Sequence, residues 1–171
     1  MRLVPNLYML DGVNGNVFTM PVPATVNAFV NATVHQIPEI NALLAQSVDK
    51  AAGDQGFVLF NLDAQTVANL PLSDGFNTVA NLDAGTVVCC LATRKVVARA
   101  LKHGGSSAVI YNLATGDVAV VANPDGVTGI GPPAAPGGGA RVVLTNAQAN
   151  TVSAVAYANN RQVGIVVIRV P

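Results

Sequence analysis

The alternation of apolar and polar residues at the start of the chain predicts a β-hairpin. Two apolar runs, residues 7–10 and 17–20, flank residues 11–16, which are rich in Asp, Gly and Asn. These residue types accept the positive φ angles that tight hairpin turns require. We therefore expect residues 2–22 to form two antiparallel strands joined by a turn.

Apolar spacing predicts helices in the segments that follow. From Pro23 to Gly53 the apolar side chains recur every three or four positions, and Pro38 interrupts the helix and restarts it. Residues 86–102 show the same spacing, with four basic residues on one side and apolar residues elsewhere. A strand is the alternative for residues 96–101, but the spacing of the charges favours a helix.

The other apolar runs are short and predict strands, since residues typical of turns separate them. These strands are expected at residues 57–60, 62–72, 108–111, 118–121, 142–145, 152–157 and 163–170. The last run is apolar at successive positions, so we expect both of its faces to be covered.

Residues 123–140 are rich in proline and glycine and predict a loop, either an arm laid on a partner or a lid. Its glycines at positions 126–131 lack the lysine of a phosphate-binding loop, so a plain loop is the better interpretation. Together these elements predict one α+β domain, residues 1–171. It would contain antiparallel sheets of about 8–10 strands, with two or three helices packed on one side.

Four stretches share a turn followed by valine: residues 61–67, 81–87, 112–118 and 144–153. They are similar to the hairpins of β-propellers that carry a V-T-N-x-x-x-N-T-V repeat. Propeller blades have four strands each, whereas helices are predicted here where further strands should be. We interpret the likeness as shared hairpin chemistry.

Charge is scarce in this chain. Only 11% of the residues are charged, and the nine basic and nine acidic residues cancel, whereas about 25% is usual for soluble domains. Lysine occurs three times, and protein interfaces are depleted in lysine and glutamate. One interpretation is a surface solvated by neutral polar groups. The other, which we favour, is a homo-oligomer or larger assembly: a structural subunit such as a virion component (capsid, decoration or tail protein) or another shell protein.

A thiol hydrolase or deamidase is the enzymatic alternative. Cys90 would be the nucleophile, His103 the base and Asp117 the orienting carboxylate. If residues 86–103 form one helix, however, Cys90 and His103 lie about 20 Å apart, and only a hairpin could bring them together. Cys89 and Cys90 sit in an apolar run, where cysteines are usually small core residues.

A third alternative is a small module that binds an anionic ligand on a basic helix. The residues concerned are Arg94, Lys95, Arg99 and Lys102. Residues 84–116 carry these four charges and no acid, whereas residues 1–83 carry two basic and seven acidic residues. The basic face could instead be solvated, or contact the acidic half of a neighbouring copy. Nucleic acid is a poor fit, because tryptophan is absent and aromatic residues are only 5%.

The sequence indicates no cofactor and no metal site, because its two histidines and its carboxylates lack ligand spacing. No apolar run approaches the ~20 residues of a membrane helix, and the N-terminus does not resemble a signal peptide. We therefore expect no membrane contact and a location in the cytoplasm or inside a virion or other assembly.

Overall fold

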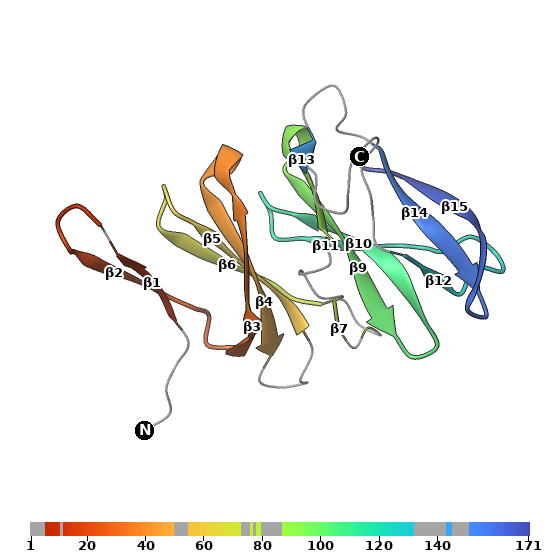
Figure 1. The fold of residues 1–171 in the computed structure, drawn as a ribbon, viewed down its shortest axis with the longest axis horizontal. Helices are drawn as coiled ribbons and strands as arrows, with labels where there is room; N and C mark the ends of the chain where they lie inside the picture. The colour runs from red at the N-terminus through yellow and green to blue at the C-terminus, as the bar shows by residue number, and fades with distance from the viewer. Residues whose placement is uncertain are drawn as a thin grey trace.

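The computed structural model describes residues 6–10, 12–49, 55–72, 76, 78–79, 87–131, 143–144 and 151–171. In this part of the chain the backbone forms strands β1 to β15. They are arranged in four layers that follow one another in chain order, from the N-terminal hairpin to the C-terminal strands (Figure 1).

The layers are built as follows. The N-terminal hairpin consists of β1 (Asn6–Leu10) and β2 (Val17–Pro21). Sheet 1 consists of β3 (Val26–Ile37), β4 (Ala42–Asp49), β5 (Gln55–Asn61) and β6 (Thr66–Leu70). Sheet 2 consists of β8 (Val87–Cys90), β9 (Lys95–Lys102), β10 (Gly105–Asn112) and β11 (Val118–Val121). Sheet 3 consists of β12 (Gly129–Ile130), β14 (Thr151–Ala158) and β15 (Arg161–Arg169).

Two short strands extend these layers. β7 (Thr78–Val79) pairs with β9 in antiparallel fashion and with β5 in parallel fashion, so it links sheets 1 and 2. β13 (Val143–Leu144) pairs in parallel with β8 of sheet 2. The pairing of β7 joins the first residue of β5 to the end of β9, so sheets 1 and 2 are continuous at these strand ends.

The α+β prediction is wrong. The predicted helix after Pro23 is β3, its continuation after Pro38 is β4, and the predicted helix over residues 86–102 is β8 followed by β9. Among the described residues the helical backbone is limited to two three-residue turns, η1 (Pro38–Ile40) and η3 (Leu91–Thr93). In the same part of the chain there is no helix of the length and apolarity needed to cross a membrane.

Burial on both faces explains why the spacing of apolar residues predicted helices where the structure has strands. A strand that is covered on one side alternates apolar and polar residues, but a strand between two layers does not. Val96, Val97 and Ala98 are successive residues of β9, and each is at most 1% exposed. The remaining polar positions in such a run are too few to distinguish a period of two from one of 3.6.

Sheets 1 and 2 are each a four-stranded antiparallel meander, in which strands that follow one another in sequence also pair. This is the number of strands in a propeller blade. Strands therefore accompany the hairpins at residues 61–67 and 112–118 where helices were predicted: β3 and β4 in sheet 1, and β8 and β9 in sheet 2.

The two meanders share one local device at the corner between their first and second strands. After η1 the backbone of Asn41 is left-handed at φ 43°, and after η3 Arg94 is left-handed at φ 49°. The carbonyl of Asn41 accepts a hydrogen bond from Leu62 N at 3.0 Å, and that of Arg94 accepts one from Leu113 N at 2.8 Å. Each corner is thereby tied to the hairpin between the third and fourth strands of its own sheet.

Apolar clusters fill the three spaces between the layers. Between the N-terminal hairpin and sheet 1 lie Met20, Val22, Val26, Ala45, Val58 and Phe60. Between sheets 1 and 2 lie Ile37, Ala42, Leu44, Phe57, Leu59, Leu70, Phe76, Cys89, Val96, Ala98, Ala100, Val109 and Tyr111. Between sheets 2 and 3 lie Val88, Cys90, Val97, Ala108, Ile110, Ile130, Val152, Ala154, Ile168 and Val170. Sheets 1 and 2 therefore bury both of their faces.

Several sequence predictions are confirmed. The N-terminal hairpin, the strand at residues 57–60 with its returning strand, the hairpin at 108–121 and the three C-terminal strands all occur. The first part of the predicted loop at 123–140 is built into the fold, since Gly129 and Ile130 form β12 and pair with β14. Residues 132–140 lie outside the described residues, so the arm or lid stays a prediction.

The close contact of Gly56 with the end of β6 predicts a sharp effect of substitution. A Cβ atom at Gly56 would lie 2.5 Å from the carbonyl oxygen of Leu70, whereas one at Gly164 would have no neighbour within 4 Å. Overpacking against backbone costs about 1–3 kcal/mol. We expect Gly56→Ala to lower the free energy of unfolding, measured in urea by circular dichroism, by about that amount. Gly164→Ala is the matched control, and equal midpoints for the two variants would contradict the packing.

Candidate functional site

The cysteine and histidine of the predicted hydrolase lie at opposite ends of β9. Cys90 ends β8 and pairs with Lys95 at the start of β9, while His103 follows Lys102 in the turn after β9. The seven steps from Lys95 to Lys102 span about 23 Å of extended chain. The segment is the hairpin that the hypothesis required, but Cys90 lies at its turn and His103 lies beyond its far end.

The predicted carboxylate is engaged within its own turn. Asp117 lies between β10 and β11, where Thr115 Oγ1 donates a hydrogen bond to its carboxylate at 2.6 Å. The backbone of Asn112 donates to the carbonyl of Asp117 at 2.9 Å. Asn112 pairs with Lys95, so Asp117 lies near the Cys90 end of the strands and far from His103. The structure does not bring the three side chains together.

The environment of Cys90 does not favour a nucleophile. Its side chain is 1% exposed, in the cluster between sheets 2 and 3. Burial raises the pKa of the Cys90 thiol from 9.0 to about 11, and the nearby Lys95 ammonium lowers it by a smaller amount. Reactive cysteines have a lowered pKa, so this thiol has the properties of a core residue.

The four basic residues of the predicted helix do not share a face. Side chains alternate across a strand, so Lys95 and Arg99 point toward sheet 3, and Lys102 points toward sheet 1. Arg94 lies at the corner before β9. The basic helix is therefore absent, and the predicted binding face is divided between two sides of sheet 2.

Two of these residues contact other parts of the chain. Lys95 Nζ donates a hydrogen bond to the carbonyl of Pro171. Lys102 Nζ lies over the ring of Phe76, 5.6 Å from its centroid, which is a cation–π distance. Lys95 thus contacts the C-terminal residue, and Lys102 contacts the segment between β6 and β7.

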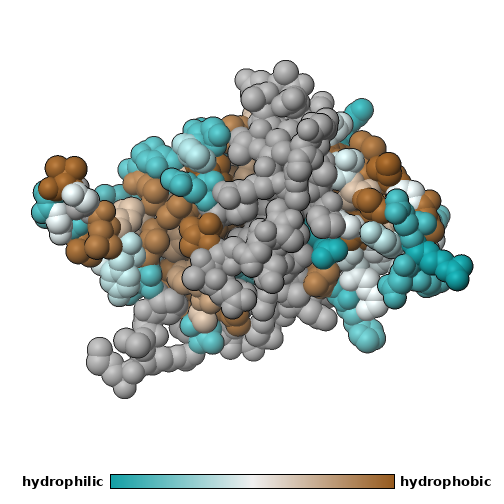
Figure 2. All heavy atoms as spheres, in the orientation of Figure 1, coloured by the Kyte–Doolittle hydropathy of each residue, from teal (hydrophilic) through white to brown (hydrophobic). Residues whose placement is uncertain are grey.

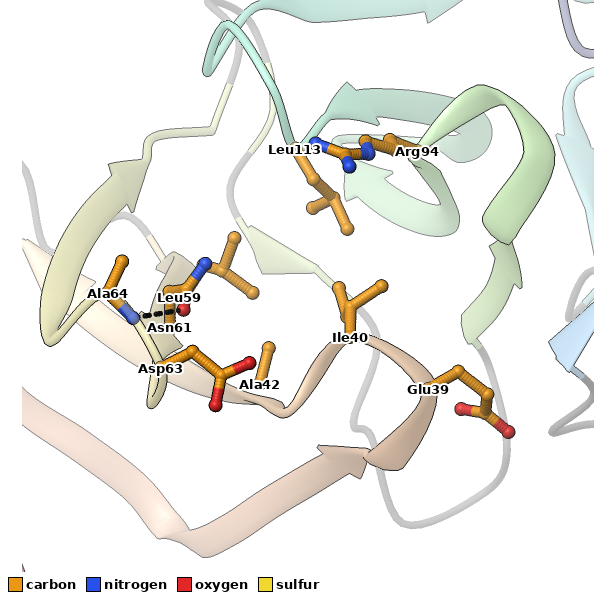
Figure 3. Close-up of a pocket in the computed structure, with 9 residues that line it drawn as sticks. All are labelled: Glu39, Ile40, Ala42, Leu59, Asn61, Asp63, Ala64, Arg94 and Leu113. Atoms are coloured by element: carbon orange, nitrogen blue, oxygen red, sulfur yellow. Dashed lines mark hydrogen bonds between the residues drawn. The ribbon is translucent and has the colours of Figure 1, made fainter.

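Arg94 borders a cavity of about 350 Å³ between sheets 1 and 2. In Figure 3 Arg94 and Leu113 lie on one side of this cavity, and Ile40 and Leu59 lie on the other. Glu39 and Asp63 also line it, and Asp63 accepts a hydrogen bond from Asn41 Nδ2 at 2.5 Å. Two carboxylates and one guanidinium thus border this space, so its lining does not carry charge of one sign.

Arg99 borders a larger cavity, of about 550 Å³, between sheets 2 and 3. Among the described residues that line this cavity it is the one charged residue; the others are Leu101, Gly104, Gly105, Ser106, Thr128, Gly129, Ile130, Gly131, Tyr157, Asn159 and Asn160. Of the four basic residues singled out in the sequence, Arg99 is thus the one that borders a cavity with no other charged residue among its described lining.

The two end layers expose apolar side chains on their outer faces. Figure 2 shows apolar surface over the N-terminal hairpin and over sheet 3. We call the first the N-face; its large apolar side chains are Tyr8, Leu10 and Val17, exposed by 59%, 76% and 59%. We call the second the C-face; its large apolar side chains are Val163, Ile165 and Val167, exposed by 56%, 71% and 67%.

The pairing of the strands shows that each face is continuous. Leu10 lies opposite Val17 across the N-terminal hairpin. Val155 lies opposite Ile165 in sheet 3, two positions from the pair of Ser153 and Val167. The sequence signal for the C-face was the apolar run of the last strand, from which we expected both faces to be covered. In the single chain the outer face of this strand is open.

Metal chemistry has no support in the part of the chain that the structure describes. No three residues among its His, Cys, Asp and Glu side chains lie close enough to hold a metal ion.

Comparison with known proteins gives a likeness of fold. No family model matches this chain, and no curated protein matches it. Among solved structures, the crystal structure of TolB from Acinetobacter baumannii is similar, with a TM-score of 0.50 and 14% sequence identity. The match covers 99% of this chain and 36% of that chain, so this chain spans little more than a third of its length. At this identity the likeness concerns the arrangement of the strands alone.

The buried thiol predicts slow alkylation of the native protein. A rise in pKa from 9.0 to about 11 lowers the thiolate fraction near pH 7.5 by about 100-fold. We expect iodoacetamide to modify native Cys90 at least 100-fold more slowly than in the guanidinium-unfolded chain. Mass spectrometry of timed samples measures both rates. A fast reaction of native Cys90 near pH 6 would instead indicate an activated nucleophile.

Alkaline pH should lower stability. Burial raises the pKa of Tyr111 as well as that of Cys90. Above pH 9 the unfolded chain therefore loses these protons before the native protein does, and the free energy of unfolding falls as pH rises. The free energy of unfolding should fall by at most about 1.4 kcal/mol per pH unit for each group. Urea unfolding between pH 8 and 10.5 measures this dependence, and Tyr111→Phe should make it shallower. An unchanged pH dependence in Tyr111→Phe would contradict the assignment to Tyr111.

Proposed function

We propose that this protein is a structural subunit that associates head to tail with copies of itself, the C-face of one copy packing on the N-face of the next. One observation supports the proposal above the others. The inner faces of the stack are covered by apolar neighbours, whereas the N-face and the C-face expose apolar residues of the same kind to solvent.

The contact would continue the packing that already occurs within the chain. Each pair of successive layers buries valine, leucine, isoleucine and aromatic side chains between two sheets. The row Val163, Ile165 and Val167 on β15 is an outward face of the same composition. Covering it with the N-terminal hairpin of another copy would place an apolar hairpin on an apolar sheet, as occurs between β1–β2 and sheet 1.

Charge favours this orientation over a contact between like ends. Residues 1–83 contain two basic and seven acidic residues, so residues 84–171 contain the remaining seven basic and two acidic residues of the nine of each. A head-to-tail contact brings the basic half of one copy to the acidic half of the next, whereas contact between like ends would bring like charges together. Arg169 lies at the end of the exposed row on β15.

The size of the faces predicts moderate affinity. Burying an exposed valine, leucine or isoleucine contributes about 1.5–3 kcal/mol, and association costs about 4–15 kcal/mol of lost freedom. The two faces together contribute five such side chains and Tyr8, a gain of the same order as this cost, so we expect a weak contact and an oligomer that grows with protein concentration. A head-to-tail contact is heterologous and produces a ring if it closes, or a filament if it does not.

Sequence composition suggested a more specific form, a virion component such as a capsid, decoration or tail protein, or another shell protein. That form stays a prediction, since the contact proposed here serves any assembled structure. The hydrolase alternative is less favoured, because Cys90, His103 and Asp117 lie apart and the thiol is buried.

The proposal is tested by placing a lysine on each face. Leu10→Lys on the N-face and Val167→Lys on the C-face would each bury an unpaired charge at the contact, which we expect to weaken association by at least about 100-fold, or about 3 kcal/mol. Sedimentation velocity over a range of protein concentrations measures the effect. Val120→Lys is the matched control, because Val120 is 44% exposed on β11, away from both faces.

A mixture of the two face variants distinguishes the orientation. Each variant retains one intact face, so an equimolar mixture of Leu10→Lys and Val167→Lys should form a dimer although neither variant associates alone. If Leu10→Lys still dimerises by itself, the contact joins like ends. If wild-type protein is a monomer at all concentrations, the proposed function is wrong.

A further inference from the structure

We propose that the cavity between sheets 2 and 3 is a binding site for a small oxyanion, a carboxylate or a phosphate group, held by the guanidinium of Arg99. The site is distinct from the N-face and the C-face. It does not depend on self-association, so the two proposals succeed or fail separately.

The cavity is lined by segments that are far apart in the sequence. Its walls come from β9 and β10 of sheet 2, from β12 and the residue before it, and from the end of β14 with the following turn. Its volume of about 550 Å³ falls within the 300–1,000 Å³ typical of ligand sites. It therefore has room for an organic molecule that carries an anionic group.

Part of the hydrogen-bonding capacity of the Arg99 guanidinium is unused. Its side chain is partly buried, and Nη1 donates to the carbonyl of Ile130 at 3.5 Å, the outer limit of a hydrogen bond. Its Nε atom is buried and has no hydrogen-bond partner within the described part of the chain. A guanidinium has five donors and is always charged, so its desolvation is costly unless an acceptor, preferably an anion, is present.

The described lining of the cavity contains no carboxylate, since none of the described residues around it is acidic. No acidic residue follows Asp125 in the sequence, so β12, β14, β15 and the segments between them contain none. A bound anion would thus be the natural partner of Arg99, and it would meet no repulsion from these segments.

The other described groups around Arg99 in this cavity are neutral. Ser106 Oγ is already committed, since it donates to Ile130 O at 2.8 Å and accepts from Ile130 N at 2.9 Å, which holds β12 against sheet 2. Asn160, in the turn after β14, also lines the cavity, and a side-chain amide is a group that can donate to an oxyanion.

Glycine shapes the wall that separates the two sheets. A Cβ atom at Gly105 would collide with the carbonyl oxygen of Thr128, and one at Gly129 would lie 3.0 Å from Ser106 Oγ. Glycine at these positions lets β10 and β12 approach closely. The short stretch at residues 126–131, which sequence analysis assigned to a plain loop, thus forms one side of the proposed site.

A carboxylate and a phosphate both match a guanidinium, since each can accept two parallel hydrogen bonds from it. Two probes, sodium acetate and sodium phosphate, separate these ligand types. Each is titrated at constant ionic strength into ¹⁵N-labelled protein. We expect saturable shifts of the backbone amides of Gly105, Gly129, Gly131 and Asn160, and the probe that binds more tightly identifies the type of anionic group.

Substitution of the guanidinium tests the assignment. Arg99→Gln should weaken binding of the tighter probe by at least 10-fold, and Arg99→Lys should weaken it less, because a lysine retains the charge but loses the fork of donors. Arg94→Gln is the matched control; it removes the same charge from sheet 2 at the other cavity, and we expect less than a 2-fold change.

Two results would overturn the proposal. One is the absence of saturable shifts at the four cavity amides of wild-type protein with both probes, a measurement that does not require any variant to fold. The other is an equal loss of affinity in Arg99→Gln and Arg94→Gln, which would show that the anions respond to net charge alone.

Discussion

Face-to-face packing of apolar sheets is the constraint on which the structure depends. A β-sheet buries apolar surface only where another layer covers it, and each layer here is covered by the next one along the chain. Phe57 of sheet 1 and Tyr111 of sheet 2 show the closeness of this packing, since their rings meet edge to face with centroids 5.2 Å apart. The low charge content follows, because strands between two layers have few positions open to water.

The same constraint places the features that could serve a function. Within the stack the layers leave cavities toward their ends, where corners and hairpins replace paired strands, and Arg94 and Arg99 border these spaces. At the two ends of the stack nothing in the chain continues the packing, so apolar side chains such as Leu10 and Ile165 remain exposed. The proposed anion site between layers and the proposed assembly at the ends therefore rest on one architecture.

Sequence reasoning succeeded where local chemistry decides the structure. The glycine- and asparagine-rich turns identified the N-terminal hairpin and the hairpin at residues 108–121, and the shared turn pattern at residues 61–67 and 112–118 corresponds to equivalent hairpins of sheets 1 and 2. It failed at β3, β4, β8 and β9. There the burial of both faces removes the alternation that marks a strand, and the left-handed corners at Asn41 and Arg94 interrupt the pattern further.

By itself, then, the sequence determined the charge of the chain and the position of most turns: little charge, an acidic first half, a basic second half, and short apolar runs separated by turn residues. Only the tertiary structure decided which basic residues border a cavity and which apolar strands leave one face exposed. Whether a residue borders a cavity or is covered depends on the side of the sheet that it occupies and on the residues that lie opposite. A one-residue change of register moves a side chain to the other side of the sheet, and the residues that lie opposite are distant in the chain.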